Sequence, residues 1–339
     1  MSETMRAWQA TAYGPTKDAL SLATIPRPVP GPGELRLRVQ AASLNPIDYK
    51  LVHGALRRVQ PLSFPVSIGF DASGIVDAVG AGVTAFRVGD PVFVRASRDT
   101  LGAFAEYSVQ PERFVAHRPA NIDAIGAASL PLVALTTVQG LVDRAQVHAG
   151  ERILIHAGSG GLGSFAIQYA KALGMIVETT TSSRNAEWVQ ALGADRVICY
   201  DRDDLRARGA IYDVVFDTLG GAHTLEAFEL LKSGGAVVSV AGPPDREMAA
   251  RFAGSFVVKL AMRWMARKVY AAANRKQARY FRYLTESSGA QLAHIAAMVE
   301  LGTVHPVVDR VFDFEQGLAA FDYLEAGRAK GKVVLKMRG

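Results

Sequence analysis

The sequence of 339 residues predicts an α/β protein with a doubly wound parallel sheet and a second, mostly β domain. Three observations carry this fold class. An apolar run, a glycine-rich turn and a helical pattern follow one another between residues 152 and 174. Further apolar runs alternate with helical patterns downstream, which is typical of parallel βαβ units. Short apolar runs with turn residues between them fill the first 128 residues instead, and the length favours two domains.

The pattern of the first 128 residues predicts a compact domain of barrel type. Its candidate strands are Met5–Ala10, Leu35–Ala42, Gly74–Val79, Pro91–Val94 and Ala105–Val109. A helix is expected at Leu130–Val142, before the glycine-rich turn. At the other end of the chain, the patterns predict helices at 290–301 and 315–326 and strands at 306–312 and 332–336.

The turn after the apolar run Ile153–Ile155 carries the most informative motif. Its glycines match G-x-G-x-x-G in the strand, turn and helix context that dinucleotide binding requires. Such glycines permit a tight turn, the approach of a pyrophosphate and close helix–strand packing, while the helix N-terminus attracts the phosphates. An ordinary βα turn would also fit the motif alone, but four further strand candidates favour a dinucleotide: Met175–Thr180, Arg196–Tyr200, Asp213–Thr218 and Ala236–Ala241. The predicted contacts in the turn are Gly158, Ser159, Gly160, Gly161, Leu162 and Gly163.

The residues after the second strand of this domain indicate the coenzyme. Proteins that bind NAD usually place Asp or Glu about 20 residues after the glycines, but residues 179–185 read TTTSSRN. Glu178 lies earlier, inside the strand, and is discounted. Ser182, Ser183 and Arg184 offer the hydroxyls and the positive charge that a 2′-phosphate needs, so we expect NADPH. The alternative is that Ser182 caps the next helix and Arg184 lies on the surface.

The ends of the fourth and fifth strands provide further predicted contacts. In open parallel sheets, ligands bind beyond the carboxyl ends of the strands. We therefore expect four residues to border the cofactor, although the glycines among them fit simple turns as well: Leu219, Gly220, Ala241 and Gly242.

Six motifs keep one order over nearly the whole chain: NPIDYK at 45–50, FPVSIGFDASG at 64–74, GAGV at 80–83, FRVGDPV at 86–92, GAFAEY at 102–107 and GKVVL at 331–335. Together with the glycine-rich turn, they resemble the medium-chain dehydrogenase/reductase superfamily, and more narrowly its zinc-independent quinone oxidoreductase and enone reductase branch. The resemblance implies a GroES-like substrate domain at 1–128 and 288–339 and a Rossmann domain at 129–287, with the cofactor in the cleft between them. Relatives often form dimers, but the sequence leaves monomer and homodimer open.

By this resemblance, Asn45 and Tyr49 line the cleft beside the nicotinamide, and Tyr49 is a candidate proton donor. Alternatively, Tyr49 only packs against the cofactor and Asn45 caps the turn before Pro46. Asp48 and Lys50 are expected to be structural or to face solvent. Further cofactor contacts are implied for Thr136, Tyr200 and Lys332, although helix packing for Thr136 and a plain surface position for Lys332 fit equally well.

The resemblance departs from the zinc-dependent branch at the residues that would bind metal. Gly69-Phe70-Asp71 stands where that branch has Gly-His-Glu, and residues 43–46 stand where it has its first catalytic cysteine. Phenylalanine cannot ligate zinc, and none of the seven histidines shows a recognisable ligand spacing. We therefore expect no metal.

Without a Lewis acid, hydride transfer needs an acceptor that is already electrophilic. An enal, an enone or a quinone fits, because protein donors and the nicotinamide ribose can stabilise the charge that develops on a carbonyl oxygen. We expect an NADPH-dependent oxidoreductase that acts on such a small molecule. The alternatives are a reductase of simple aldehydes or ketones and a sensor that binds NADPH without turnover.

Composition narrows the class of protein further. The single cysteine, Cys199, excludes a disulfide within the chain and a cysteine-based zinc site. No uncharged apolar run of about 18 residues exists, so no membrane-spanning helix is expected. The start of the chain lacks the pattern of a signal peptide, and we expect a cytoplasmic protein.

A basic helical insertion at 244–278 carries the excess charge. Between Arg246 and Arg282 ten residues are Lys or Arg and one is acidic, so the rest of this chain of net charge +6 is slightly acidic. One or two helices are expected, followed by a sixth strand near Arg279–Thr285. One helical face should carry four basic residues, opposite a broad apolar face: Lys259, Arg263, Arg267 and Lys268.

Three interpretations of this insertion compete. A helix pair that docks on the domain with a solvated basic face is favoured. A cap over the substrate cleft, with Trp264 and Tyr270 as wall residues, comes second, and attachment to anionic lipid is the least favoured. Nucleic-acid binding has no supporting motif.

Overall fold

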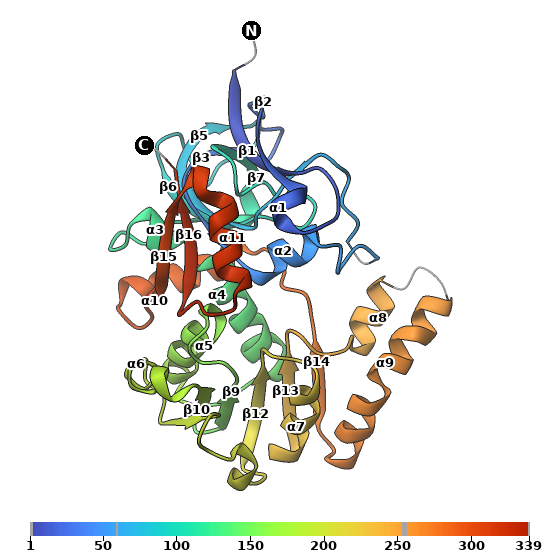
Figure 1. Ribbon diagram of the computed structural model, residues 1–339. Coiled ribbons are helices and arrows are strands. Elements are labelled where there is room, and N and C mark those ends of the chain that lie inside the picture. Colours follow the sequence, from blue (N-terminus) through green and yellow to red (C-terminus); the bar gives the residue numbers. More distant parts are fainter. Residues whose placement is uncertain (1–2, 59, 253–255, 338–339) are drawn as a thin grey trace. The chain divides into compact units, whose positions relative to one another are not determined.

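The computed structural model describes residues 3–58, 60–252 and 256–337, apart from the side chains of 251–259 (Figure 1). The chain divides into two compact units, Met1–Leu135 with Glu286–Gly339, and Thr136–Thr285. The first unit contains a 7-stranded and a 3-stranded sheet, and the second contains a 6-stranded sheet. The domain limits expected from the sequence, near residues 128 and 288, stay a prediction.

The first unit is built mainly from antiparallel strands around a main apolar core, with smaller apolar clusters beside it. The strands of its larger sheet are β3 (Glu34–Leu44), β5 (Asp71–Val79), β6 (Pro91–Arg95), β7 (Tyr107–Pro111), β8 (Val115–His117), β15 (Val308–Asp313) and β16 (Lys332–Lys336). They are ordered β15-β16-β3-β5-β6-β8, with β7 paired to β3 and with β15 parallel to β16. Along β3, Leu35, Leu37 and Val39 are buried and alternate with more exposed residues, as a strand with one face on a core requires.

The smaller sheet of this unit consists of β2 (Leu20–Pro26), β1 (Thr4–Ala10) and β4 (Val66–Ser67). Trp8 of β1 lies in the same core as the residues of β3, and Phe314 and Phe321 from the C-terminal part of the chain complete it. The helices of this unit are α1 (Thr16–Ala19), α2 (Pro46–Val52), α3 (Ala124–Ala128), α10 (Gly289–Glu300) and α11 (Gly317–Glu325).

The second unit is a parallel sheet of the doubly wound type. Its strands are β9 (Arg152–Ile155), β10 (Ile176–Thr181), β11 (Arg196–Cys199), β12 (Tyr212–Asp217), β13 (Leu231–Ser239) and β14 (Arg279–Arg282). Their order is β11-β10-β9-β12-β13-β14, so the strand order reverses between β9 and β12. The connecting helices α5 (Gly161–Ala172), α6 (Ala186–Ala191) and α7 (Ala222–Leu230) pack beside the sheet (Figure 1). The predicted α/β fold class is confirmed, and its ligand site is expected at the carboxyl edge next to the reversal.

The helix expected at Leu130–Val142 is divided in two. α4 (Pro131–Val138) is an α-helix, and a π-helix continues over Gln139–Ala145. Gly140 lies in the π-helical part, where a Cβ would lie 2.6 Å from the hydroxyl oxygen of Tyr283. The helix therefore packs closely at a residue without a side chain, and the apolar pattern of the sequence does not reveal the change of pitch.

The basic insertion forms two helices, α8 (Arg246–Phe252) and α9 (Phe256–Arg275). Val269 and Ala273 of α9 are buried in the core that contains Phe228 of α7. The solvent face of α9 mixes large apolar and basic side chains: Leu260, Arg263, Trp264, Met265, Arg267 and Lys268. The expected separation into a basic and an apolar face is therefore wrong, because small side chains and Val269, rather than the large apolar ones, form the buried side. The side chain of Lys259 lies outside the described ones.

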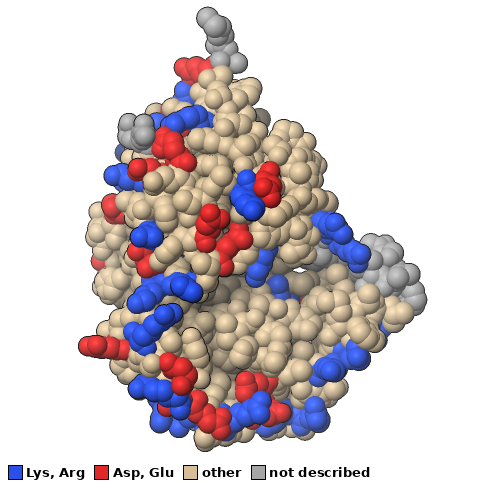
Figure 2. All heavy atoms as spheres, viewed as in Figure 1, with Lys and Arg blue, Asp and Glu red and all other residues tan. Residues whose placement is uncertain are grey.

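On the face shown in Figure 2, basic but no acidic side chains lie over α9. In the described part of the chain, no helix is both long and apolar enough to cross a membrane.

Candidate cofactor-binding and active site

The glycine-rich turn between β9 and α5 is packed so tightly that two of its glycines cannot carry a side chain. A Cβ on Gly158 would lie 2.3 Å from Oγ1 of Thr179, and a Cβ on Gly163 would lie 2.3 Å from the carbonyl oxygen of Ala157. A Cβ on Gly160 would meet no atom closer than 3.4 Å. Gly158 and Gly163 therefore allow α5 to approach the strand, whereas Gly160 leaves space beside the turn.

The start of α5 fits an anion such as a pyrophosphate. Gly160 is the N-cap residue in an extended conformation and provides no side-chain hydrogen bond to the helix. The first helical hydrogen bond runs from the N–H of Ser164 to the carbonyl oxygen of Gly160 (2.9 Å), so the N–H groups of residues 161–163 precede it. These donors and the positive end of the helix dipole suit a phosphate. The structure thus brings all six predicted turn residues together, with Ser159 among them.

A buried carboxylate at the end of β12, Asp217, holds one of the two loops predicted to border the cofactor. Its Oδ1 accepts hydrogen bonds from the N–H groups of Leu219 (3.0 Å) and Gly220 (2.9 Å), and its Oδ2 accepts one from the hydroxyl of Thr224 (2.6 Å). Burial by itself would raise the pKa of Asp217, but hydrogen bonds from His156 and Thr224 outweigh it and hold this pKa below its usual range. Asp217 is therefore an ionised anchor, which sequence reasoning did not single out.

The second loop is attached to the same carboxylate. The hydroxyl of Ser239, the last residue of β13, donates to Asp217 Oδ2 (2.8 Å) and accepts from the N–H of Gly242 (2.7 Å). The strand ends at Ser239, so Ala241 and Gly242 lie in the loop beyond it. A Cβ on Gly220 would lie 2.6 Å from the carbonyl oxygen of Ala241, so the two loops touch. The structure brings these four predicted residues together at the carboxyl edge of the sheet.

Glu178 of β10, which the sequence analysis discounts, is engaged inside the second unit. Its carboxylate forms ion pairs with Arg152 (2.7 Å) and Arg208 (2.7 Å) and accepts a hydrogen bond from the hydroxyl of Tyr212 (2.7 Å). Burial opposes ionisation, but the hydrogen bonds from Arg208 and Tyr212 hold the pKa of Glu178 below its usual range. This carboxylate is therefore bound by protein groups and is not available to accept hydrogen bonds from a ribose.

The three residues predicted to bind a 2′-phosphate follow β10 and differ in how far their side chains already bond to other protein groups. Ser182 is buried and makes no side-chain hydrogen bond as a helix cap; its Oγ accepts a hydrogen bond from Asn185 (3.2 Å). Ser183 donates its N–H (2.9 Å) and its hydroxyl (2.7 Å) to Asp201. Arg184 is exposed and has no acidic partner among the described residues. Arg184 is thus the side chain of the three that is best able to meet a phosphate.

Asp201 is a neighbour of this site that sequence reasoning missed. It directly follows Tyr200, which lies beyond the end of β11 with 67% of its surface exposed. β10 and β11 are adjacent and parallel, so the residues after them meet at one edge of the sheet. That adjacency was the available signal, because the residues after one strand of a parallel pair lie beside those after its neighbour.

In the first unit, Asn45 and Lys332 meet in a buried polar cluster. Nζ of Lys332, at the start of β16, donates to Oδ1 of Asn45 and lies 3.4 Å from Oδ2 of Asp71. Nδ2 of Asn45 donates to the same oxygen of Asp71 (2.8 Å). Asp48 and Arg95 complete the cluster, and each of the five residues is at most 5% exposed. Asn45 is the N-cap residue of α2 and forms a capping box with Asp48, whose Oδ2 accepts a hydrogen bond from the N–H of Asn45 (2.7 Å), while the Asn45 side chain also contacts Asp71 and Lys332.

Burial shifts the ionisation of this cluster toward the neutral forms. It raises the pKa of Asp48 to about 8 and raises that of Asp71, and it lowers the pKa of Lys332. Oδ1 of Asp48, Oδ1 of Asp71 and Nε of Arg95 have no hydrogen-bond partner among the described residues. The pKa values of the two carboxyl groups and of Lys332 therefore lie closer together in this cluster than they would at the protein surface.

The alternative of a plain surface position for Lys332 is wrong, because its side chain is buried at the start of β16. Of the two positions expected for Asp48, the structure shows the structural one: its side chain is buried and accepts a hydrogen bond from the N–H of Asn45. Sequence reasoning also missed Asp71. Its signal was the triplet Gly69-Phe70-Asp71, which was considered for its missing histidine rather than for its carboxylate.

Tyr49 and Thr136 do not share the hydrogen bonds of this cluster. Tyr49 is half-buried on α2 with its ring centroid 5.6 Å from that of His53, and its hydroxyl makes no hydrogen bond within the described residues. Thr136 is buried in the second unit, where its Oγ1 lies 2.7 Å from Oγ1 of Thr285 and its carbonyl oxygen accepts from Tyr283. Their contacts to a cofactor stay predictions.

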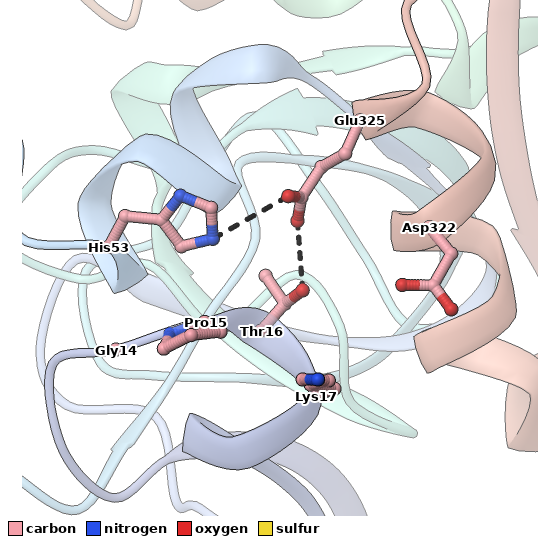
Figure 3. Close-up of a pocket in the computed structure, with 7 residues that line it drawn as sticks. All are labelled: Gly14, Pro15, Thr16, Lys17, His53, Asp322 and Glu325. Carbon is pink, nitrogen blue, oxygen red and sulfur yellow. Dashed lines mark hydrogen bonds and ion pairs between the residues drawn. The ribbon is translucent and has the colours of Figure 1, made fainter.

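A hollow of about 410 Å³ in the first unit contains none of the predicted site residues (Figure 3). It is lined by Gly14, Pro15, Thr16, Lys17, His53, Asp322 and Glu325. Glu325 accepts a hydrogen bond from the hydroxyl of Thr16 (2.8 Å) and lies 3.6 Å from Nε2 of His53. These contacts hold the side chains of Thr16, His53 and Glu325 in place, so no ligand is needed to explain their positions.

The residue that replaces the zinc-binding histidine is part of the core. Phe70 is fully buried, and the guanidinium carbon of Arg95 lies 4.7 Å from the centroid of its ring. Neither group is a metal ligand. Within residues 3–58, 60–252 and 256–337, no three His, Cys, Asp or Glu side chains are placed to hold a metal ion. The expectation of a metal-free protein stays a prediction.

Comparison with known proteins shows that the chain is similar to dehydrogenases and reductases. Residues 31–120 match the family model "Alcohol dehydrogenase GroES-like domain", and residues 192–335 match "Zinc-binding dehydrogenase". The chain is 34% identical to an NADPH-dependent alkenal/one oxidoreductase of Arabidopsis thaliana and 32% identical to a 2-methylene-furan-3-one reductase of Solanum lycopersicum. Both matches cover 98% of this chain and 79% of the relative. The solved quinone oxidoreductase of Coxiella burnetii superposes with a TM-score of 0.85 at 32% identity, covering 99% of this chain and all of that one.

Proposed function

Because the chain belongs to the medium-chain dehydrogenase/reductase superfamily, and within it to the zinc-independent branch of quinone oxidoreductases and enone reductases, we propose that it is an NADPH-dependent reductase. It transfers hydride to an activated alkene, such as an enal or enone, or to a quinone. The observation that carries this proposal is the similarity, over 98% of the chain, to an NADPH-dependent alkenal/one oxidoreductase and to a 2-methylene-furan-3-one reductase.

The second unit supplies the groups that would hold NADPH, which contributes the hydride when bound. The N–H groups at the start of α5 would hold the pyrophosphate, and the loops anchored by Asp217 would border the cofactor. Arg184, which is exposed and unpaired among the described residues, would bind the 2′-phosphate with its guanidinium. The engagement of Glu178 by Arg152, Arg208 and Tyr212 supports this choice, since no carboxylate is left for a ribose hydroxyl at that strand.

The first unit supplies the groups for the substrate. Asn45 is held by Lys332 and Asp71, so its side chain is oriented before any ligand binds. When hydride adds to the β-carbon of an enone, negative charge develops on the carbonyl oxygen, and hydrogen-bond donors placed there stabilise it. The proton that completes the reduction comes from water or from Tyr49. The role of Tyr49 rests on the family resemblance alone.

The cellular location and the assembly of the protein are further parts of the proposal. We expect a cytoplasmic protein that binds no nucleic acid, and the assembly, a monomer or a homodimer, is left open. The Arabidopsis relative is named as chloroplastic, so the location needs its own test. Fluorescence microscopy of the tagged chain tests the location, and light scattering of the purified chain distinguishes the monomer from the homodimer.

NADPH oxidation with three acceptors tests the proposed activity. The panel is a 2-alkenone, a para-quinone and a saturated aldehyde, with NADH as the control coenzyme and with identification of the products. Conversion of the alkenone to the saturated ketone, or of the quinone to the hydroquinone, with NADPH preferred, is the expected result. Reduction of the aldehyde alone would contradict the argument for an electrophilic acceptor. Tight NADPH binding without turnover of any acceptor would favour a sensor.

A further inference from the structure

The solvent face of α9 exposes apolar side chains that the fold does not use. Leu260 is 57% exposed, Trp264 64% and Met265 56%. They lie on consecutive turns of one helix and point away from the buried side that Val269 and Ala273 form. Scattered single apolar residues are normal on a protein surface, but a contiguous group of this size commonly marks an interaction site.

Basic side chains surround these apolar ones. Arg263, Arg267 and Lys268 are exposed, and none has an acidic partner among the described residues. The guanidinium carbon of Arg267 lies 3.9 Å from the ring centroid of Trp264, so charge and aromatic surface are presented together. No Asp or Glu occurs in the sequence between Glu247 and Glu286. The segment therefore has no acidic residue of its own to neutralise this face.

We propose that α9 docks on the surface of an anionic lipid membrane, lying in the interface without crossing it. The positive face attracts anionic headgroups, while Leu260, Trp264 and Met265 enter the boundary of the acyl chains. Tryptophan suits this boundary because its ring is apolar and its N–H is polar. α9 is too polar to span a bilayer, which agrees with a helix that lies on the surface. This proposal does not depend on the proposed enzymatic activity.

Charge decides between a membrane and a second copy of the chain. In a symmetric dimer through this face, the same residues would oppose each other, so Arg263, Arg267 and Lys268 would meet like charges. An anionic bilayer provides a negative surface of any extent. It also accepts apolar side chains without a shaped pocket, and α9 presents a convex helix face rather than a groove.

Vesicle co-sedimentation of the full-length chain tests the proposal. The vesicles are pure phosphatidylcholine, and phosphatidylcholine with phosphatidylglycerol at a ratio of about 7 to 3, a content in the range where basic residues respond to the surface charge. We expect binding to the anionic vesicles that high salt weakens, and little binding to the neutral ones. Each basic side chain near such a surface strengthens binding about fivefold, so the variant R263Q/R267Q/K268Q should lose about a hundredfold in affinity.

Two further variants separate the contributions of charge and apolar contact. The variant L260Q/W264Q/M265Q keeps the charge of α9 and should also lose most of its vesicle binding. The matched control R57Q/R196Q/R328Q removes three exposed arginines elsewhere on the chain and should bind like the wild type. The melting temperature of each variant shows whether it is folded. Trp264 should also report directly, because its fluorescence shifts to the blue with anionic vesicles and this shift is lost in W264F.

Several results would overturn the proposal. No binding of the wild type to anionic vesicles would do so, and so would equal binding to neutral ones. An equal loss of binding in the control variant would show that net charge, and not α9, is responsible. A dimer that light scattering detects in the wild type and not in L260Q/W264Q/M265Q would assign this face to a second copy.

Discussion

Gly160, the N-cap residue of α5, and Gly163, in the first turn of that helix, should respond differently to alanine because a Cβ would meet different neighbours at the two positions. In Gly163→Ala, the new Cβ would lie 2.3 Å from the carbonyl oxygen of Ala157 and 2.7 Å from Cα of Gly158. Both are backbone atoms, so the start of α5 and the turn must separate by about 1 Å to restore ordinary contact. In Gly160→Ala, the nearest atom is 3.4 Å away and φ is −79°, a value that alanine adopts without strain.

The expected magnitudes follow from these distances. Overpacking of this kind costs about 1–3 kcal/mol, so Gly163→Ala should lower the Tm by roughly 3–10 °C. The displaced N–H groups should also bind NADPH more weakly. Loss of one hydrogen bond to a charged phosphate costs about 1.5–3 kcal/mol, which corresponds to about 10- to 150-fold in Kd. Gly160→Ala should leave the Tm unchanged but weaken NADPH binding by a similar factor, because its methyl group occupies the side of the turn that a pyrophosphate must approach.

Thermal unfolding without cofactor and titration of NADPH by fluorescence measure both quantities. A wild-type Tm for Gly163→Ala would show that the packing argument is wrong. Wild-type NADPH affinity in Gly160→Ala, with the Tm unchanged, would show that the pyrophosphate does not bind at this turn.

Four other substitutions test the site residue by residue. Arg184→Glu should raise the KM for NADPH by about 10- to 100-fold and hardly change that for NADH; an equal loss for both coenzymes would contradict the 2′-phosphate assignment. Tyr49→Phe should lower kcat with little effect on the KM for NADPH, and an unchanged kcat would leave water as the proton source. Asp217→Asn should lower the Tm at neutral pH, and the difference in Tm between the variant and the wild type should shrink below about pH 4. The reason is that a carboxylate with a lowered pKa in the folded protein loses its stabilising contribution as it is protonated. A difference in Tm that stays constant with pH would contradict ionisation of Asp217. Burial raises the pKa of Asp48 in the folded protein to about 8, so ionisation of this group should destabilise the wild type as the pH rises from about 4 to 8. Asp48→Asn lacks this ionisation, so its Tm should rise relative to that of the wild type over the same range. Parallel Tm profiles of the two proteins would contradict the raised pKa.

The local patterns of the sequence determined the arrangement of the second unit. Apolar runs that suit strands buried on both faces, and a glycine motif in its proper context, were enough to predict a doubly wound sheet and the turn that faces a phosphate. These features depend on residues close in sequence, and the structure places all six predicted turn residues together. The family motifs likewise identify the superfamily, because they are read directly from the residues.

Only the tertiary structure decided which polar groups are engaged. Asp71, Asp48 and Lys332 are brought together from β5, α2 and β16, and their burial, which shifts their pKa values, depends on strand pairing between distant segments. Asp217 became an anchor because Thr224 and Ser239 come from separate elements to meet it.

Contacts between segments far apart in the chain also decided which side of α9 faces solvent. Its helical period is visible in the sequence, but which side is buried depends on where α7 and β14 pack. Small residues and Val269 fit against them, so the large apolar side chains remained exposed beside the basic ones. A sequence determines which residues can share a face or a turn, because that follows from backbone geometry. Which face is covered, and which charge finds a partner, follows from contacts between segments far apart in the chain.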